Sequence, residues 1–346
     1  MSLNLKVKRS LTIFTNKTAY IFVCGLVFLY LCLFPLAKAQ ETSAVNLNTD
    51  NKQTAYEWLL HLSQQLHQLN FEMSFVVHIP GKETQPYLWR HAVMDDNTRI
   101  EQLSLLNGPG MEQIRYNQVV SVFEPGFAPY STVSAAIDGP IPWMLLHHPT
   151  LVKAAYEFVL VGRNRISGKA AQQLRIISRD KTRFNYHLWL DEETGLLLKL
   201  NMYDLDNKLI KQIQATQLTI DDDVKLAFSS VQPENLPQVV NMKNAPPRQH
   251  KWRVSFMPEG MQRVKQDVHR LAITNQIVEY SMLSDGLIDV SVYVQPALDI
   301  FQQDVSLRQD TNTILSRTNG RVQVTIIGEI PLTTADKMAN SIVLVN

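Results

Sequence analysis

Apolar residues recur at every second position from Phe71 onward, and this alternation governs which folds the chain can adopt. Between Phe71 and Ile79 they alternate with more polar neighbours, as a half-buried strand requires. Short polar turns separate the stretches, so neighbours in sequence are expected to pair as an antiparallel meander. Eight further stretches follow the same pattern: 87–94, 99–106, 112–123, 157–166, 171–179, 183–190, 196–203 and 208–220.

One helical pattern precedes these strands. Leucines recur at helical spacing over 54–69, and Thr54 with Glu57 predicts a capping box at the start of the helix. One long helix and about nine strands predict a strongly curved sheet wrapped around that helix. The fold class is therefore α+β with mainly antiparallel β-structure, and this first domain is expected to span 54–231.

The segment 124–150 interrupts the strands. Prolines at five positions forbid long regular elements, yet the segment is unusually apolar for a loop. Two uses are open: a plug that closes one end of the curved sheet, or a mobile lid over an apolar cavity that binds a ligand. The residues expected to line such a ligand pocket are Phe127, Tyr130, Trp143, Met144 and Leu145.

A second unit follows a stretch with four prolines, 232–247, which reads as an interdomain linker. Over 248–346, a hairpin is expected at Ser284-Asp285-Gly286 and another at Asn319-Gly320. Thr333 or Thr334 is expected to cap a short terminal helix. The prediction is an antiparallel sheet that carries one helix.

The first 39 residues resemble a secretory leader. Basic residues precede an apolar run over 19–37, and Ala37-Lys38-Ala39 matches a signal-peptidase site. We expect cleavage after Ala39, a flexible polar start over 40–53, and a periplasmic or secreted product. An uncleaved membrane anchor is the alternative, because the apolar run approaches spanning length.

Export narrows the chemistry of the mature chain. Cys24 and Cys32 both lie in the leader, so the mature chain has no cysteine for disulfides or metal. The leader also holds five of the 33 Lys and Arg residues and none of the 32 Asp and Glu residues, so the mature chain carries a net charge of −4. This charge argues against nucleic-acid binding.

No catalytic or cofactor motif assembles in the sequence. His147-His148 is the most tempting metal pair, but adjacent side chains point opposite ways in an extended segment. Asp221-Asp222-Asp223 lacks the alternating ligand spacing of a calcium loop. We therefore predict no metal, no cofactor and no enzyme activity; a hydrolase would require scattered His and Asp residues to converge in space.

Arginines give a weaker signal for binding. They lie either on solvated outer faces of strands or on a docking surface for an acidic peptide or an anionic lipid head. The docking alternative rests on the ability of guanidinium groups to pair bidentately with carboxylate and phosphate. The candidate contact residues are Arg163, Arg165, Arg179, Arg183, Arg253 and Arg263.

Seven stretches, in order, resemble the RseB/MucB family of periplasmic regulators of the extracytoplasmic sigma factor. Their order and spacing cover nearly all of the predicted mature chain, although no single stretch is diagnostic. They are Asn70-Phe-Glu-Met-Ser-Phe75, Phe123-Glu-Pro-Gly126, Val161-Gly-Arg-Asn-Arg-Ile-Ser-Gly168, Arg179-Asp-Lys-Thr-Arg-Phe-Asn-Tyr186, Leu188-Trp-Leu-Asp-Glu-Glu-Thr-Gly195, Trp252-Arg-Val-Ser-Phe-Met-Pro-Glu-Gly260 and Tyr280-Ser-Met-Leu-Ser-Asp-Gly286.

The resemblance implies a first domain built as an unclosed β-barrel, like LolA, LolB and LppX, and a smaller antiparallel domain with a helix. It also implies binding to the periplasmic part of an anti-sigma factor such as RseA or MucA. Binding would shield that factor from proteases and restrain the sigma-E response, and lipopolysaccharide or acyl ligands would cause release. The alternative is a lipid or lipoprotein carrier. A possible homo-oligomer stays open.

Overall fold

The structure, a computed structural model, describes residues 53–240, 250–270, 277–297 and 304–345. The predicted leader, the flexible start as far as residue 52, and residues 241–249 of the predicted linker lie outside the described residues. Within the described ranges, no helix is both long enough and apolar enough to cross a membrane.

The first element is the predicted helix, α1 (Ala55–Gln68). Its capping box is confirmed: the Glu57 amide donates to Thr54 Oγ1 at 3.2 Å, and the Thr54 amide donates to the Glu57 carboxylate at 2.6 Å. Leu59, Leu62 and Leu66 are buried, so one face of α1 is committed to the core.

Eleven strands form one antiparallel sheet, with β1 at its centre between β2 and β11. The sheet ends at β6 on one side and β7 on the other, and these two strands do not pair with each other. The prediction of an unclosed barrel is therefore confirmed. The strands are β1 (Phe71–His78), β2 (Gln85–Val93), β3 (Arg99–Leu105), β4 (Glu112–Tyr116), β5 (Val119–Phe123), β6 (Tyr130–Val133), β7 (Tyr156–Ile166), β8 (Lys169–Ser178), β9 (Asn185–Asp191), β10 (Leu197–Tyr203) and β11 (Leu209–Ile220).

The expectation of a single strand stretch over 112–123 is wrong. Asn117 adopts a φ of 54°, in the left-handed region that asparagine tolerates, and the chain reverses there between β4 and β5. The proline-rich segment likewise contains a short strand, β6, and a short helix, α2 (Trp143–His147). The split into β4 and β5 and the extra strand β6 raise the number of strands in this region from the nine predicted to eleven.

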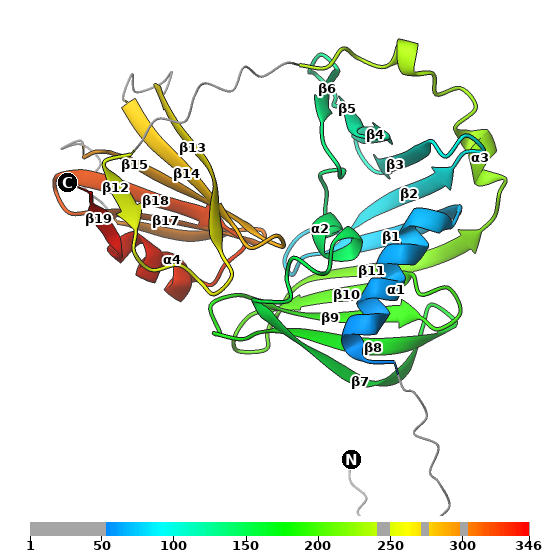
Figure 1. The fold of residues 1–346 in the computed structure, drawn as a ribbon, viewed down its shortest axis with the longest axis horizontal. Coiled ribbons are helices and arrows are strands. Elements are labelled where there is room, and N and C mark those ends of the chain that lie inside the picture. Colours follow the sequence, from blue (N-terminus) through cyan, green and yellow to red (C-terminus); the bar gives the residue numbers. More distant parts are fainter. Residues whose placement is uncertain (1–52, 241–249, 271–276, 298–303, 346) are drawn as a thin grey trace, which may run out of the picture. The chain divides into compact units, whose positions relative to one another are not determined.

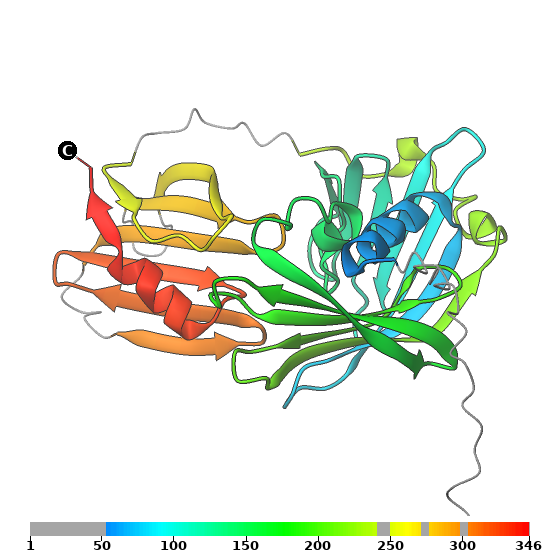
Figure 2. The same ribbon diagram turned by 60° about the horizontal axis from the view of Figure 1, so that its bottom comes forward.

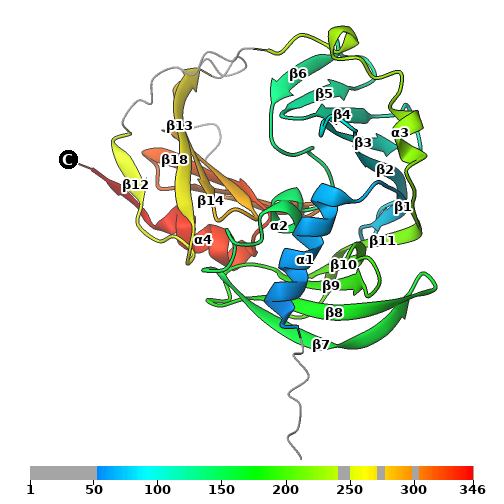
Figure 3. The same cartoon turned by 45° about the vertical axis from the view of Figure 1, so that its right-hand side comes forward.

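The concave face of this sheet holds α1 with α2 beside it (Figures 1 and 3). Trp143, Leu145 and Leu146 of α2 are buried in the same apolar cluster as the α1 leucines. The Trp143 ring meets Trp89 of β2 edge-on, with 4.6 Å between ring centroids. The end of the sheet near α2 is thus filled by side chains.

The start of the predicted linker lies against β6. Ser131 Oγ donates to the Pro237 carbonyl at 2.6 Å, and Ser131 also bridges to Val239 in a parallel arrangement. Two short helices precede this contact, α3 (Val224–Ala227) and η1 (Pro233–Asn235). We call residues 54–240 the large-sheet region and residues 250–345 the small-sheet region.

The small-sheet region contains a separate six-stranded antiparallel sheet in the order β13-β14-β15-β18-β17-β16. Helix α4 packs against this sheet (Figure 2). The predicted sheet with one helix is confirmed. The elements are β12 (Trp252–Val254), β13 (Gln262–Arg270), β14 (Ile277–Ser284), β15 (Asp289–Pro296), β16 (Val305–Gln309), β17 (Asn312–Thr318), β18 (Val322–Gly328), α4 (Leu332–Asn340) and β19 (Ile342–Leu344), the last paired with β12.

The predicted cap of the terminal helix is wrong. Helix α4 begins after Pro331, whose side chain has no hydrogen-bond acceptor to cap it, and Thr334 lies inside the first turn. Proline is favoured at the start of a helix because its missing N–H would have no partner there. The Thr334 hydroxyl is instead used in a contact with the large-sheet region.

Candidate functional site

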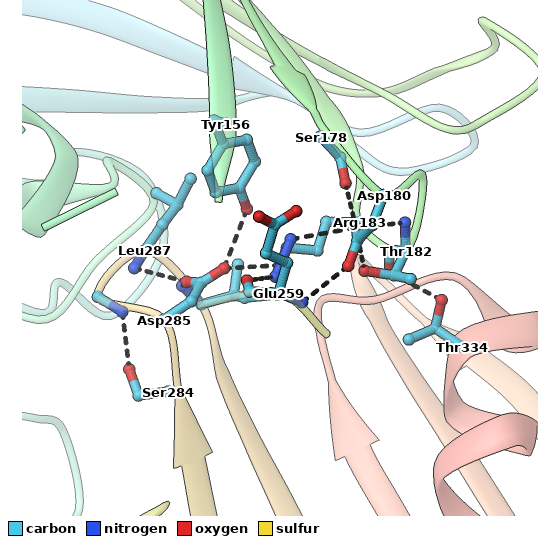
Figure 4. Close-up of polar contacts among 12 residues, drawn as sticks. Tyr156, Ser178, Asp180, Thr182, Arg183, Glu259, Ser284, Asp285, Leu287 and Thr334 are labelled. Atoms are coloured by element: carbon cyan, nitrogen blue, oxygen red, sulfur yellow. Dashed lines mark hydrogen bonds and ion pairs between the residues drawn. The ribbon is translucent and has the colours of Figure 1, made fainter. Parts of the chain in front are cut away.

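A buried ion pair joins the two regions. Arg183 lies in the turn between β8 and β9, and Asp285 lies in the turn between β14 and β15 (Figure 4). Arg183 Nε is 2.8 Å from Asp285 Oδ2, and neither side chain is exposed to solvent. The Nε–H is not aligned with an acceptor, so the contact is an ion pair and not a directed hydrogen bond. Without Arg183, the buried Asp285 carboxylate would have no cation beside it.

The rest of the Arg183 guanidinium is held by Asp180 and Glu259. Its Nη1 lies 3.3 Å from Asp180 Oδ1, and its Nη2 donates to the Glu259 backbone carbonyl. Asp180 Oδ2 in turn accepts from the Glu259 amide at 2.8 Å. A fourth contact between the regions runs from the Thr334 hydroxyl to the Thr182 carbonyl at 2.8 Å. Side chains and backbone of both regions therefore form one polar cluster, the junction cluster (Figure 4).

Tyr156 completes the cluster on the side of the large sheet. Its hydroxyl donates to Asp285 Oδ2 at 3.4 Å, and the Arg183 guanidinium lies 5.4 Å from the centre of its ring. Burial, together with Tyr186 and Asp285, raises the pKa of Tyr156 well above its usual range. Burial also opposes ionisation of Asp180, but hydrogen bonds from Thr182 and the Glu259 amide lower its pKa overall. The cluster thus holds Tyr156 neutral and Asp180 ionised.

Two glycines let the backbones of the regions approach. Gly286 has a φ of 85°, and a Cβ there would lie 2.9 Å from the Leu151 Cβ. Gly260 has a φ of 77°, and its Cβ would lie 3.2 Å from the Ala155 Cβ. Glycine tolerates this backbone conformation and leaves room for the neighbouring chain.

Beside the cluster lies a pocket of about 430 Å³ with walls from both regions, which we call the junction pocket. Lys211 Nζ lies 3.3 Å from Glu329 Oε1 across it. The remaining wall combines apolar side chains with polar ones such as Asp138, Asp289 and Asn312, a mixture suited to a peptide segment or a small molecule. The wall includes Ile137, Ile141, Trp143, Met144, Tyr186, Leu200 and Met202 from the large-sheet region, and Leu287, Ile288, Asp289 and Asn312 from the small-sheet region.

The structure separates the five apolar residues expected to line one ligand pocket. Trp143 and Met144 line the junction pocket. Leu145 is fully buried in the core beneath it. Phe127 is 72% exposed and Tyr130 is 42% exposed, and neither lines the junction pocket.

The six predicted arginines also divide. Arg163 is largely exposed and pairs with Glu192 at 2.8 Å, and Arg179 is exposed. Arg165 donates to the Gly168 carbonyl. Arg183 is the exception, because its fully buried side chain has no surface to offer a partner. Arg253 and Arg263 line a pocket of about 160 Å³ in the small-sheet region.

A second buried polar group lies in the large sheet. Register places His91, Glu101 and Arg115 side by side across β2, β3 and β4. Arg115 Nε donates to Glu101 Oε2 at 2.8 Å, and His147 Nε2 of α2 lies 3.8 Å from Glu101 Oε1. Burial opposes ionisation of Glu101, but Arg115 lowers its pKa overall. Burial lowers the pKa of His147 to about 4 despite the nearby carboxylate, so this histidine is neutral at pH 7.

Sequence reasoning missed both polar groups. One signal was available for the second, since three successive predicted strands each carry a titratable residue in their interior: His91, Glu101 and Arg115. Asp285 and Asp180 carried no such signal, because an aspartate in a turn is usual at the surface. Among the described residues, no three His, Cys, Asp or Glu side chains are grouped so as to hold a metal ion.

Two family models together match almost the whole described chain. The MucB/RseB N-terminal domain matches 54–240, and the MucB/RseB C-terminal domain matches 246–343. The chain belongs to the MucB/RseB family. The junction cluster and the junction pocket therefore lie where the two domains of this family meet.

Curated relatives and solved structures agree with this assignment. RseB, the sigma-E factor regulatory protein of Salmonella typhimurium (strain 14028s / SGSC 2262), is 30% identical over 79% of this chain and 86% of its own. MucB, the sigma factor AlgU regulatory protein of Pseudomonas aeruginosa PAO1, is 27% identical over 83% of this chain and 90% of its own. A crystal structure of MucB in complex with MucA(peri) has a TM-score of 0.66 and 27% identity, and covers 84% of this chain and 99% of MucB.

Proposed function

We propose that this protein binds the periplasmic segment of a membrane-anchored anti-sigma factor, as a regulator of a sigma-E-type stress response. The observation that carries the proposal is the likeness, over both domains, to a MucB structure that contains MucA(peri). While bound, the protein shields the anti-sigma factor from the proteases that would degrade it. The sigma factor then stays restrained.

The junction pocket is the candidate contact for that segment. Both domains supply its walls, so a peptide seated there would touch both at once. A carrier of lipid alone would need only the curved sheet, whereas a pocket shared between domains gives the C-terminal domain a role. Met144 is the natural probe, because it is 36% exposed at the pocket wall.

The test is capture of the purified periplasmic domain of an RseA/MucA-like anti-sigma factor from the same organism. Met144→Glu should weaken capture by about tenfold or more, since it would replace an apolar contact with a further negative charge in a wall that already holds Asp138 and Asp289. Leu226→Glu, at a 70% exposed leucine of α3 outside the pocket, is the matched control and should bind like the wild type. Deleting 248–346 should abolish capture while circular dichroism shows a folded N-terminal domain. Unchanged affinity after that deletion would sink the proposal.

Release by a lipid forms a second part of the proposal. An acyl chain or lipopolysaccharide would enter the curved sheet near α2 and compete with the arrangement that binds the partner. Each acyl methylene taken from water contributes about 0.8 kcal/mol, which would count against the cost of opening the helix-filled end of the sheet. The alternative, a lipid or lipoprotein carrier, predicts lipid binding without capture of the anti-sigma factor.

The proposed location is the periplasm, reached by a cleaved leader. N-terminal sequencing of the protein from an envelope fraction should begin at Gln40. An intact Met1 would indicate an anchored form.

A further inference from the structure

A second pocket, of about 690 Å³, opens on the large-sheet region and shares no lining residue with the junction pocket, and we call it the basic pocket. Its walls come from the end of α1, the turns before β3 and after β4, and the residues around the end of α2. Its volume lies in the range of small-molecule sites. The basic residues of its wall are His67, Arg99, Arg115, His147 and His148, and its other residues are Asn97, Tyr116, Asn117, Gln118, Val119 and Ala135.

The wall contains no carboxylate. Glu101, which pairs with the lining residue Arg115 at 2.8 Å, is itself fully buried. No carboxylate of the described residues lies within ion-pair distance of Arg99, whose Nη1 is instead 3.5 Å from His67 Nδ1. One positive charge at the pocket is therefore uncompensated.

Arg115 retains donors for a ligand. Its Nε donates to the Glu101 carboxylate, and its Nη1 donates to the Asn117 carbonyl at 2.7 Å. Its Nη2 has no hydrogen-bond acceptor among the described residues. The side chain is only 8% exposed, so its position is set by the fold. A buried and oriented guanidinium is a better anion donor than a flexible surface lysine, because little side-chain entropy remains to be lost.

We propose that the basic pocket binds a phosphate group, carried by a soluble phosphate ester or by a lipid head. Arg99 and Arg115 would supply the charge and the paired N–H donors that match phosphate oxygens. His67 and His147 would add donors on protonation, and the Asn97 and Gln118 amides would contact the rest of the ligand. This site is separate from the anti-sigma contact proposed above.

Histidine chemistry makes the binding pH-dependent. His147 faces His67 of α1, with 5.2 Å between ring centroids, and it also faces Glu101, Arg115 and His91. Without ligand, burial lowers the pKa of both His147 and His67. A bound phosphate favours the protonated rings and raises both pKa values, so binding should be accompanied by proton uptake at His147 and His67.

The direct test is calorimetric titration of the purified protein with glycerol 3-phosphate, alongside nitrogen chemical shifts of the histidine rings. Arg99→Gln removes the uncompensated charge at an exposed position and should weaken binding by about tenfold. Arg175→Gln is the matched control, because it removes an exposed arginine outside the pocket. Its affinity should equal that of the wild type, and shifts of the His67 and His147 rings should accompany binding.

A second arm identifies the source of the phosphate. Vesicles of phosphatidylcholine with phosphatidylglycerol, compared with phosphatidylcholine alone, measure capture of a lipid head. Capture lost in Arg99→Gln but kept in Arg175→Gln assigns the site to a lipid, and binding of glycerol 3-phosphate alone assigns it to a soluble ester. Absence of saturable binding in both arms, or equal losses in the two variants, overturns the proposal.

Discussion

At the scale of single residues, the ion pair between Arg183 and Asp285 contributes to the stability of the junction between the two domains. Removing one member of a fully buried pair leaves the other uncompensated, which costs about 3–5 kcal/mol. Arg183→Ala should therefore lower the free energy of unfolding by about that amount, measured by chemical denaturation. Arg163→Ala, which breaks a pair that is 78% exposed on the arginine, should change it little. The double change Arg183→Met with Asp285→Leu should recover most of the loss; a loss equal to that of Arg183→Ala would contradict the ion-pair explanation.

Trp143 tests whether the α2 segment is a plug or a lid. Its side chain is 4% exposed and packs edge-on against Trp89, which favours a plug. Trp143→Ala should then lower the free energy of unfolding by about 3–5 kcal/mol. A lid would instead lose lipid affinity with little change in melting temperature, so calorimetry and a lipid-binding assay on the same variant separate the two.

The β14–β15 hairpin shows how one element sets the joint between domains. Gly286→Ala adds a Cβ that would lie 2.9 Å from Leu151, while Gly320→Ala in the β17–β18 turn meets open space. Both glycines have a positive φ, so both variants carry a backbone cost of about 1–2 kcal/mol. Only Gly286→Ala should further weaken the contact between the domains, visible as faster proteolysis between them. Equal rates of proteolysis in the two variants would mean that the contact between Gly286 and Leu151 does not hold the domains together.

Titratable groups make the stability of the whole molecule depend on pH. Burial lowers the pKa of His147 and of His187 from 6.5 to about 4 in the folded chain. Between these values the unfolded chain binds protons that the folded chain does not, so stability should fall as pH drops from about 6.5 to about 4. Glu101 and Asp180, whose pKa values are lowered in the fold, extend the loss to lower pH. His147→Gln and His187→Gln should each flatten the pH dependence of the melting temperature; a slope unchanged in both would refute this assignment.

Local pattern in the sequence was sufficient for most of the elements and for the fold class of this protein. Alternation with period two, a helix with a capping box, and turn residues between strands depend on neighbours within a few positions. The curved sheet around α1 and the separate small sheet follow from them, whereas the open edge of the large sheet was implied by the resemblance to the RseB/MucB family. The split at Asn117 was missed because one asparagine in a left-handed conformation interrupts the pattern without changing its period.

Only the tertiary structure decided which polar residues form sites. Arg183 and Asp285 are about a hundred residues apart, and each lies in a turn where a charged residue is usually solvated. Glu101 and His147 meet because β3 and α2 pack together, a contact that no spacing rule encodes. Burial of a charge depends on what the rest of the chain places over it. That is a property of packing between distant segments, and for this reason the sequence alone could assign Arg183 to a surface while the fold encloses it completely.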